Sequence, residues 1–185
     1  FVPNVHREID IASAIEISNS MTFINKVGVF ADQPIEYVIS IINQCGLDYA
    51  QLSGNESLEY CMQVGLPIIK SLKIDTNSNI KTIKRKIFPI IDSLINNNVI
   101  PLIESSVPGF YGGTGTQISL DIAKEIAENF DIILAGGLTP LNVKSMVDYI
   151  NPWGVDVASG VESEKKQTPD KIIQFISNAK NGDNE

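Results

Sequence analysis

The residues best suited to chemistry lie in one stretch, residues 99–115, with the sequence VIPLIESSVPGFYGGTG. Its apolar beginning, residues 99–103, predicts a strand buried on both faces. Glu104 follows, and then a loop with four glycines. A carboxylate at the mouth of a buried parallel strand suits general acid or base catalysis. The alternative is a rim carboxylate that accepts hydrogen bonds from the N–H groups of the loop.

Glycines also follow the last two predicted strands. Gly136 and Gly137 come directly after one of them, and Ser159 and Gly160 after the next. Glycine lets backbone N–H groups approach a phosphate closely, and the last two loops of (β/α)8 barrels often bind phosphate. Because both loops match, we favour phosphate binding over simple tight turns.

Four charged or titratable residues are further candidates. Asp156 falls inside the predicted strand 154–158, where a buried charge either needs a partner or faces the site. Arg7 follows a predicted strand end and could hold a carboxylate with two hydrogen bonds, although a lone arginine is more often a surface residue. Lys70 lies within another predicted strand, where an ion pair inside a barrel is favoured over a Schiff-base role. His6, the only histidine, is expected to be exposed.

The overall composition predicts one globular domain over residues 1–185, ending in a polar tail at 180–185, because 43% of the residues are hydrophobic. The net charge of −8 argues against nucleic acid or an anionic membrane as the main partner. Cys45 and Cys61 fall in predicted helices and offer neither metal-ligand spacing nor a disulfide framework. With neither a membrane-length apolar run nor a signal peptide in the sequence, we expect a cytoplasmic protein.

Strands and helices are predicted to alternate along the chain. The strands are expected to begin near residues 26, 49, 67, 99, 131 and 154. Parallel strands with crossover helices fit either an open doubly wound sheet or a (β/α)8 TIM barrel. We favour the barrel, because nearly every strand ends in polar residues or glycine, as a ring of βα loops would. Phe1 and Val2 indicate the tail of a seventh strand, so the barrel is expected to be N-terminally incomplete by about 30 residues.

Several residues mark expected helix boundaries. Asp10 is placed to cap one helix, Gly46 to end another, and Pro169 to begin the last. Pro89 either kinks one helix or begins a second. The basic segment 81–86 is expected to be a solvated helix face.

The segments VGVFADQP, LDYAQLSGNES, PIIKSLKI, VPGFYGGTG, AGGLTPLNV and GVDVASGVES occur in this order across the chain. Together they resemble the phosphoribosylanthranilate isomerase family of tryptophan biosynthesis, and the last three are the most specific. The resemblance implies a (β/α)8 barrel. It also implies an Amadori rearrangement that converts N-(5-phosphoribosyl)anthranilate to 1-(2-carboxyphenylamino)-1-deoxyribulose 5-phosphate, without a cofactor.

The resemblance also implies a role for each candidate residue. Glu104 stands where the family has the aspartate that protonates the furanose ring oxygen. Arg7 would hold the anthranilate carboxylate, Asp156 would lie near the anthranilate nitrogen, and the two glycine loops would hold the phosphate. The base of the family is a cysteine near the end of the first strand and has no counterpart here, since both cysteines of this chain match helical positions. Ser53 stands where the family often has histidine.

Two other functions stay open at this point. One is a truncated, non-catalytic homologue that binds phosphorylated ligands. The other is a neighbouring phosphate-binding barrel enzyme such as indole-glycerol-phosphate synthase, whose catalytic lysine and glutamate we cannot place. For this protein the expected partner is a small phosphorylated molecule. The expected assembly is a monomer or homodimer, and we expect neither a metal nor a cofactor.

Overall fold

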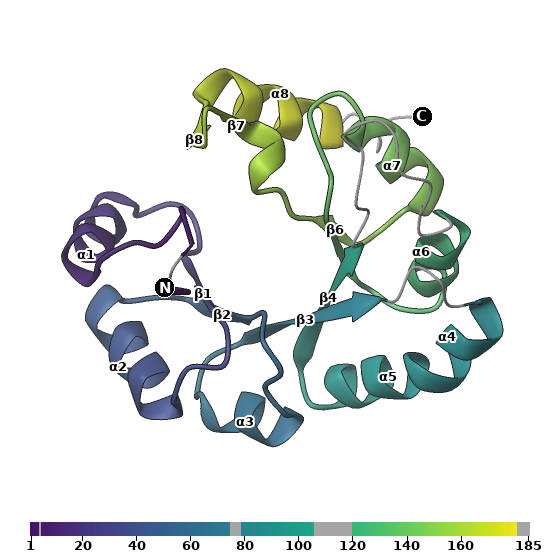
Figure 1. Ribbon diagram of the computed structural model, residues 1–185, viewed down its shortest axis with the longest axis horizontal. Helices are drawn as coiled ribbons and strands as arrows, with labels where there is room; N and C mark the ends of the chain where they lie inside the picture. The colour runs from purple at the N-terminus through teal and green to yellow at the C-terminus, as the bar shows by residue number, and fades with distance from the viewer. Residues whose placement is uncertain (4, 75–78, 106–119, 181–185) are drawn as a thin grey trace. The chain divides into compact units, whose positions relative to one another are not determined.

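Strands and helices alternate along the chain in a computed structural model that describes residues 1–3, 5–74, 79–105 and 120–180 (Figure 1). The helices are α1 (Ile11–Ser20), α2 (Ile35–Cys45), α3 (Leu58–Gln63), α4 (Ile80–Lys86), α5 (Phe88–Asn96), α6 (Leu120–Ala127), α7 (Val143–Ile150), the 3-10 helix η1 (Ser159–Val161) and α8 (Pro169–Lys180). The strands are β1 (Val27–Phe30), β2 (Tyr49–Leu52), β3 (Ile68–Ile74), β4 (Val99–Ser105), β5 (Ile133–Ala135), β6 (Gly154–Val155), β7 (Glu162–Ser163) and β8 (Lys166–Gln167).

The first six strands form one sheet in the order β1-β2-β3-β4-β5-β6. The pairs β1–β2, β2–β3, β4–β5 and β5–β6 are parallel. A parallel pair cannot be closed by a tight turn, so the chain crosses back through a helix between consecutive strands. The predicted α/β fold with a parallel sheet is therefore confirmed.

Two strand ends differ from the prediction in ways that matter for the candidate residues. Strand β4 continues to Ser105, so Glu104 lies inside it and not after it. Strand β6 comprises only Gly154–Val155, so Asp156 follows the strand and the prediction that it lies inside was wrong. The backbone N–H of Asp156 still donates to the Leu134 carbonyl at 2.9 Å, and the residue therefore keeps its place beside β5.

The chain divides into two compact units, Phe1–Ser71 with Asp92–Pro101 and Leu72–Ile91 with Leu102–Glu185. In the first unit, Phe1 and Val2 form no strand, contrary to the prediction. The ring of Phe1 stacks on Phe30 with centroids 5.3 Å apart, and its carbonyl accepts a hydrogen bond from the side chain of Gln33 at 2.7 Å. Phe1 thus lies against β1 through its ring and through a hydrogen bond from its amino group to the Val29 carbonyl at 3.1 Å, although residues 1 and 2 are not part of a strand.

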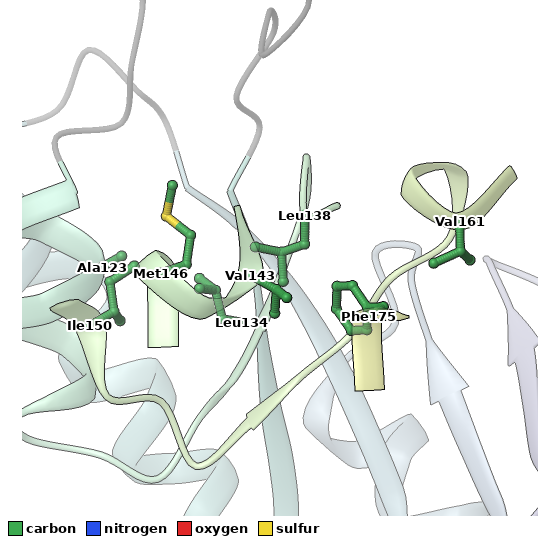
Figure 2. Packing of buried hydrophobic residues seen from close by; sticks show 8 residues of the cluster. All are labelled: Ala123, Leu134, Leu138, Val143, Met146, Ile150, Val161 and Phe175. Atoms are coloured by element: carbon green, nitrogen blue, oxygen red, sulfur yellow. The ribbon is translucent and has the colours of Figure 1, made fainter. Parts of the chain in front are cut away.

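The second unit holds two clusters of buried apolar residues. The first consists of seven isoleucines: Ile74, Ile83, Ile91, Ile103, Ile122, Ile126 and Ile132. The second, drawn in Figure 2, consists of Ala123, Leu134, Leu138, Val143, Met146, Ile150, Val161 and Phe175. Both clusters join strand residues to helix residues, so burial of these side chains attaches the helices to the sheet.

The predicted helix boundaries are confirmed at most positions. The Asp10 side chain caps α1 by accepting a hydrogen bond from the N–H of Ser13 at 2.9 Å. Gly46 ends α2 in the left-handed conformation with φ +56°. Pro89 lies in the first turn of α5, so it begins a separate helix and does not kink α4. No helix of the described residues is long and apolar enough to cross a bilayer.

The antiparallel hairpin of β7 and β8 was not predicted. Its two turn residues, Glu164 and Lys165, both have positive φ, at +51° and +63°. This is the backbone of a type I′ turn, which usually carries Asn-Gly. The turn was missed because Glu-Lys gives no such sequence signal.

Replacing Ile126 by alanine is expected to lower the free energy of unfolding by about 2–5 kcal/mol, because the side chain is 0% exposed. Chemical denaturation measures this loss. The control is Ile173→Ala, at a position 66% exposed, where a change within about 0.5 kcal/mol is expected. Equal losses in the two variants would contradict the packing described above.

Candidate functional site

Two carboxylates lie at the carboxyl ends of neighbouring strands in the second unit. The register pairs Glu104 of β4 with Ala135 of β5, and Leu134 of β5 with Val155 of β6. Asp156 follows Val155, so Glu104, Ala135 and Asp156 form one row across the sheet. Adjacent strands lie about 4.8 Å apart, which places the main chains of the two acidic residues about 10 Å apart.

Both acidic side chains lie on the sheet face opposite the helices. Ile103 belongs to the isoleucine cluster with residues of α4, α5 and α6, and Val155 packs against the second cluster. Side chains alternate along a strand, so Glu104 and Asp156 turn to the other face, where both are half-buried. Glu104 and Asp156 therefore share one face of the sheet, on either side of Ala135 in the row.

The loop after β5 has the backbone that its glycines predict. Gly136 and Gly137 have φ of +91° and +67°. Residues other than glycine rarely adopt such values, because their Cβ atom clashes with the backbone. The Asn142 side chain holds this loop from within, because it accepts from the N–H of Thr139 at 2.7 Å and donates to the Gly137 carbonyl at 3.0 Å. Asn142 was not among the predicted site residues; it occupies the N-cap position of α7, where asparagine is common, but its side chain bonds the glycine loop and does not cap the helix.

The second glycine loop is built against the first. Ser159 and Gly160 lie in the 3-10 helix η1, and a side chain at Gly160 would collide with the carbonyl oxygen of Leu138. Asn178 of α8 fixes the same loop from another side by donating to the Pro140 carbonyl at 2.7 Å. The two predicted phosphate loops therefore lie together, and Gly160 is required by the close approach of the Leu138 carbonyl.

Arg7 belongs to the first unit, in a turn in which the N–H of Glu8 donates to the Val5 carbonyl at 3.0 Å. Its side chain is exposed, and so is that of His6, as expected. The other candidates, Glu104, Asp156 and the two glycine loops, all belong to the second unit.

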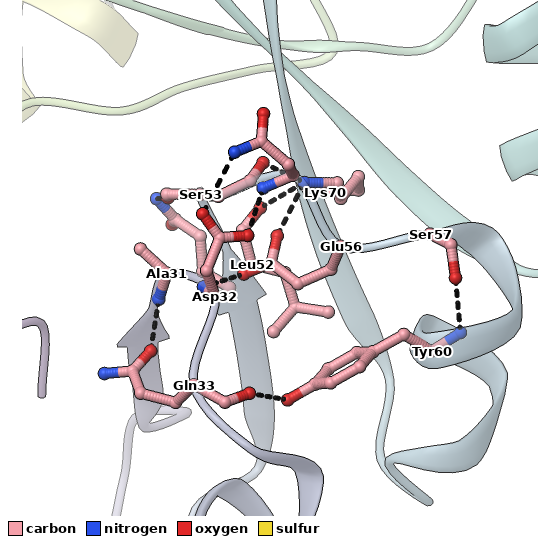
Figure 3. Close-up of polar contacts among 12 residues, drawn as sticks. Ala31, Asp32, Gln33, Leu52, Ser53, Glu56, Ser57, Tyr60 and Lys70 are labelled. Carbon is pink, nitrogen blue, oxygen red and sulfur yellow. Dashed lines mark hydrogen bonds and ion pairs between the residues drawn. The ribbon is translucent and has the colours of Figure 1, made fainter.

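Lys70 makes the ion pair that its position in a strand predicts. Its Nζ lies 2.8 Å from Glu56 Oε2 (Figure 3). Lys70 is in register with Leu52, which is 0% exposed, and its charge acts on the thiol of Cys61 in α3. The pair therefore lies on the helix side of the sheet, and the expected barrel-interior location was wrong. Glu56 was not recognised as the partner.

The two cysteines are buried in helices, as predicted. Cys45 ends α2 and Cys61 lies in α3, and each is 2% exposed. Burial raises the pKa of both thiols above the ordinary value, which favours the protonated form. A buried thiol of this kind is a poor general base.

The motif VPGFYGGTG and the end of the polar tail lie outside the described residues, in the gaps 106–119 and 181–185. Within the described ranges, no group of three or more histidine, cysteine, aspartate or glutamate residues is arranged to hold a metal ion. The candidate site consists of the two carboxylates and the two glycine loops of the second unit.

Comparison with known proteins identifies one family. The family model of N-(5'phosphoribosyl)anthranilate (PRA) isomerase matches residues 1–178. A Dehalococcoides mccartyi protein named N-(5'-phosphoribosyl)anthranilate isomerase is 36% identical over 181 residues, which are 96% of this chain and 82% of that protein.

Solved structures lead to the same family. Phosphoribosyl anthranilate isomerase from Thermotoga maritima has a TM-score of 0.80 at 31% identity, over 98% of this chain and 85% of that one. A structure of the isomerase in complex with reduced 1-(o-carboxyphenylamino)-1-deoxyribulose 5-phosphate has a TM-score of 0.78 at 28% identity, over 98% and 84% of the two chains. Since the family model spans nearly the whole chain and the relatives share its sequence and its fold, the chain belongs to the N-(5'-phosphoribosyl)anthranilate isomerase family.

Proposed function

We propose that this chain catalyses the isomerisation of N-(5'-phosphoribosyl)anthranilate to 1-(2-carboxyphenylamino)-1-deoxyribulose 5-phosphate. The observation that carries the proposal is the row of Glu104, Ala135 and Asp156 on the face of the sheet opposite the helices, next to two glycine loops. This arrangement offers acid–base groups beside backbone N–H groups suited to phosphate. The alternative is a non-catalytic protein that binds phosphorylated ligands. Measured turnover of the substrate would exclude this alternative.

In the proposed mechanism Glu104 is the general acid. Its carboxylic acid proton passes to the furanose ring oxygen, the C1′–O bond breaks, and the ring opens to a Schiff base. Removal of the C2′ proton by a general base then gives an enolamine, which relaxes to the ketose product. The reaction is an internal redistribution of hydrogen, so it consumes no redox cofactor. The buried thiols of Cys45 and Cys61 are not proposed as the base.

The remaining candidates are proposed to bind substrate. The guanidinium of Arg7 would hold the anthranilate carboxylate, since its planar fork matches a carboxylate with two hydrogen bonds. Asp156 would lie near the anthranilate nitrogen. Backbone N–H groups around Gly136, Gly137, Ser159 and Gly160 would hold the phosphate.

We further propose that the six strands of the sheet belong to a single (β/α)8 barrel domain. The similarity to the Thermotoga maritima isomerase, with a TM-score of 0.80, supports this fold. One related structure describes monomers generated from the dimeric isomerase of that organism, so both a monomer and a homodimer are consistent with the family. A biosynthetic enzyme of this kind is expected in the cytoplasm.

Replacing Glu104 by glutamine is expected to lower kcat about 100-fold or more, because an amide cannot deliver the proton. Steady-state kinetics of the protein with freshly prepared substrate measures the effect. The control is Glu128→Gln, since Glu128 is exposed in the segment after α6. Near-normal turnover of the Glu104 variant would remove it from the role of acid. Binding of the reduced product analogue without turnover in the unmodified protein would favour the non-catalytic alternative.

Replacing Arg7 by alanine is expected to raise KM about 10-fold to 100-fold, because the variant loses a charge-assisted hydrogen bond worth about 1.5–3 kcal/mol. Calorimetry with the reduced product analogue should show the same factor in Kd. An analogue that lacks the ring carboxylate should bind the Arg7 variant and the unmodified protein equally. The exposed Arg85 provides the control substitution. An unchanged KM in the Arg7 variant would take the residue out of the site.

Replacing Gly160 by alanine is expected to lower the affinity for the phosphorylated analogue at least 10-fold. The added methyl group collides with the Leu138 carbonyl, and such overpacking also costs about 1–3 kcal/mol of stability. Gly154→Ala is the matched control, since a Cβ there meets the Ile133 Cγ1 atom at an ordinary 3.6 Å. Equal analogue affinities in the two variants would argue against a phosphate site at η1.

A further inference from the structure

The buried ion pair of Lys70 and Glu56 is not used in the chemistry proposed above. Its Nζ–Oε2 distance is 2.8 Å, and the two side chains are 7% and 2% exposed. Lys70 Nζ also donates to the carbonyl oxygens of Leu52 at 3.3 Å and Gly54 at 2.7 Å. The three ammonium protons thus have three acceptors, all between the last residue of β2 and the start of α3 (Figure 3).

The same carboxylate joins this segment to the loop after β1. Glu56 Oε1 accepts from the backbone N–H of Asp32 at 2.7 Å. The Asp32 carboxylate accepts in turn from the backbone N–H of Asn55 and from its side-chain nitrogen. Asp32 has φ +60°, a left-handed conformation that is found, apart from glycine, mainly at asparagine, aspartate and histidine. A side chain at Gly54 would overlap this carboxylate. Glu56 and Asp32 therefore join the loops after β1 and β2, and Lys70 of β3 holds Glu56 in place.

This network contributes geometry more than stability. Burying two charges costs solvation that their attraction only partly restores, and apolar pairs of similar volume are often as stable or more stable. An apolar pair would fill the same space, but it would not direct the carbonyls of Leu52 and Gly54 or the N–H of Asp32 to fixed positions. The directional contacts are what the ion pair supplies.

We propose that Lys70 and Glu56 are positioning residues for substrate binding, which fix the end of β2 from the helix side of the sheet. On the opposite face of the same strand end, Gln51 and Ser53 alternate with the buried Leu52 and are hydrogen-bonded to each other at 3.3 Å. Substrate contacts in (β/α)8 barrels come from such strand ends and the loops after them. The inference rests on the isomerase function proposed above, and it assigns Ser53 and Gln51 to the substrate-facing surface.

The test compares two changes at the ion pair with a matched lysine control. The double variant Lys70→Met with Glu56→Leu is expected to keep a denaturation midpoint near that of the unmodified protein. Its KM should rise at least 10-fold with a smaller change in kcat, and its affinity for the reduced product analogue should fall by the same factor. Lys73→Met, an exposed position on the same strand, should change neither quantity.

Lys70→Arg provides the second variant, which keeps the charge but cannot place its N–H groups on the same three acceptors. A smaller rise in KM than in the double variant is expected. A folded double variant with unchanged KM and analogue affinity would show that the pair is only structural and would overturn the proposal. If the double variant does not fold, an unchanged KM in Lys70→Arg would overturn it equally.

The failure of this proposal is distinguishable from the failure of the proposed function. An unmodified protein that binds the product analogue but shows no turnover would contradict the isomerase activity. The effect of the ion pair would then still be measured by analogue affinity. A fully active protein whose analogue affinity does not respond to either variant would contradict the positioning role alone.

Discussion

Parallel pairing is the constraint on which the rest of the structure depends. A parallel strand cannot return through a tight turn, so each strand must be followed by a segment long enough to cross back, and here that segment contains a helix. This requirement separates two kinds of connection, with βα loops at the carboxyl ends of the strands and αβ loops at the opposite ends. In the second unit it places Glu104, Asp156 and the loop of Gly136 at one edge of neighbouring strands.

Two kinds of contact hold the elements in place, apolar packing and a network of hydrogen bonds. In the second unit, isoleucines on strands and helices pack into an apolar cluster, and burial of these side chains attaches the helices to the sheet. The ends of β1 and β2 in the first unit are held by a polar network that runs from the buried pair of Lys70 and Glu56 to the exposed Asp32. Apolar packing tolerates small shifts, whereas a network of this kind has one good arrangement. We therefore associate the polar network with precision at a strand end.

Close approach of backbone to backbone shapes the candidate phosphate site. Gly160 allows η1 to lie against the Leu138 carbonyl, and Asn142 satisfies a donor and an acceptor that the bent loop would otherwise leave unpaired. The cost of the left-handed backbone is small at Gly136 and Gly137 but larger at Glu164 and Lys165 in the neighbouring hairpin. Glycine is thus found where the two loops meet, and the hairpin turn adopts a similar backbone without it.

The sequence by itself determined the strand–helix alternation, the bounds of β2 and the family, because apolar periodicity, glycine and capping residues act over a few neighbouring positions. It also indicated that Lys70 needs a buried partner. Only the tertiary structure decided that this partner is Glu56, 14 residues away, that Gly160 faces Leu138, and that Glu104 and Asp156 share a row with Ala135. These contacts join segments far apart in the chain, and they depend on strand register and on how closely elements pack, which local residue patterns do not specify.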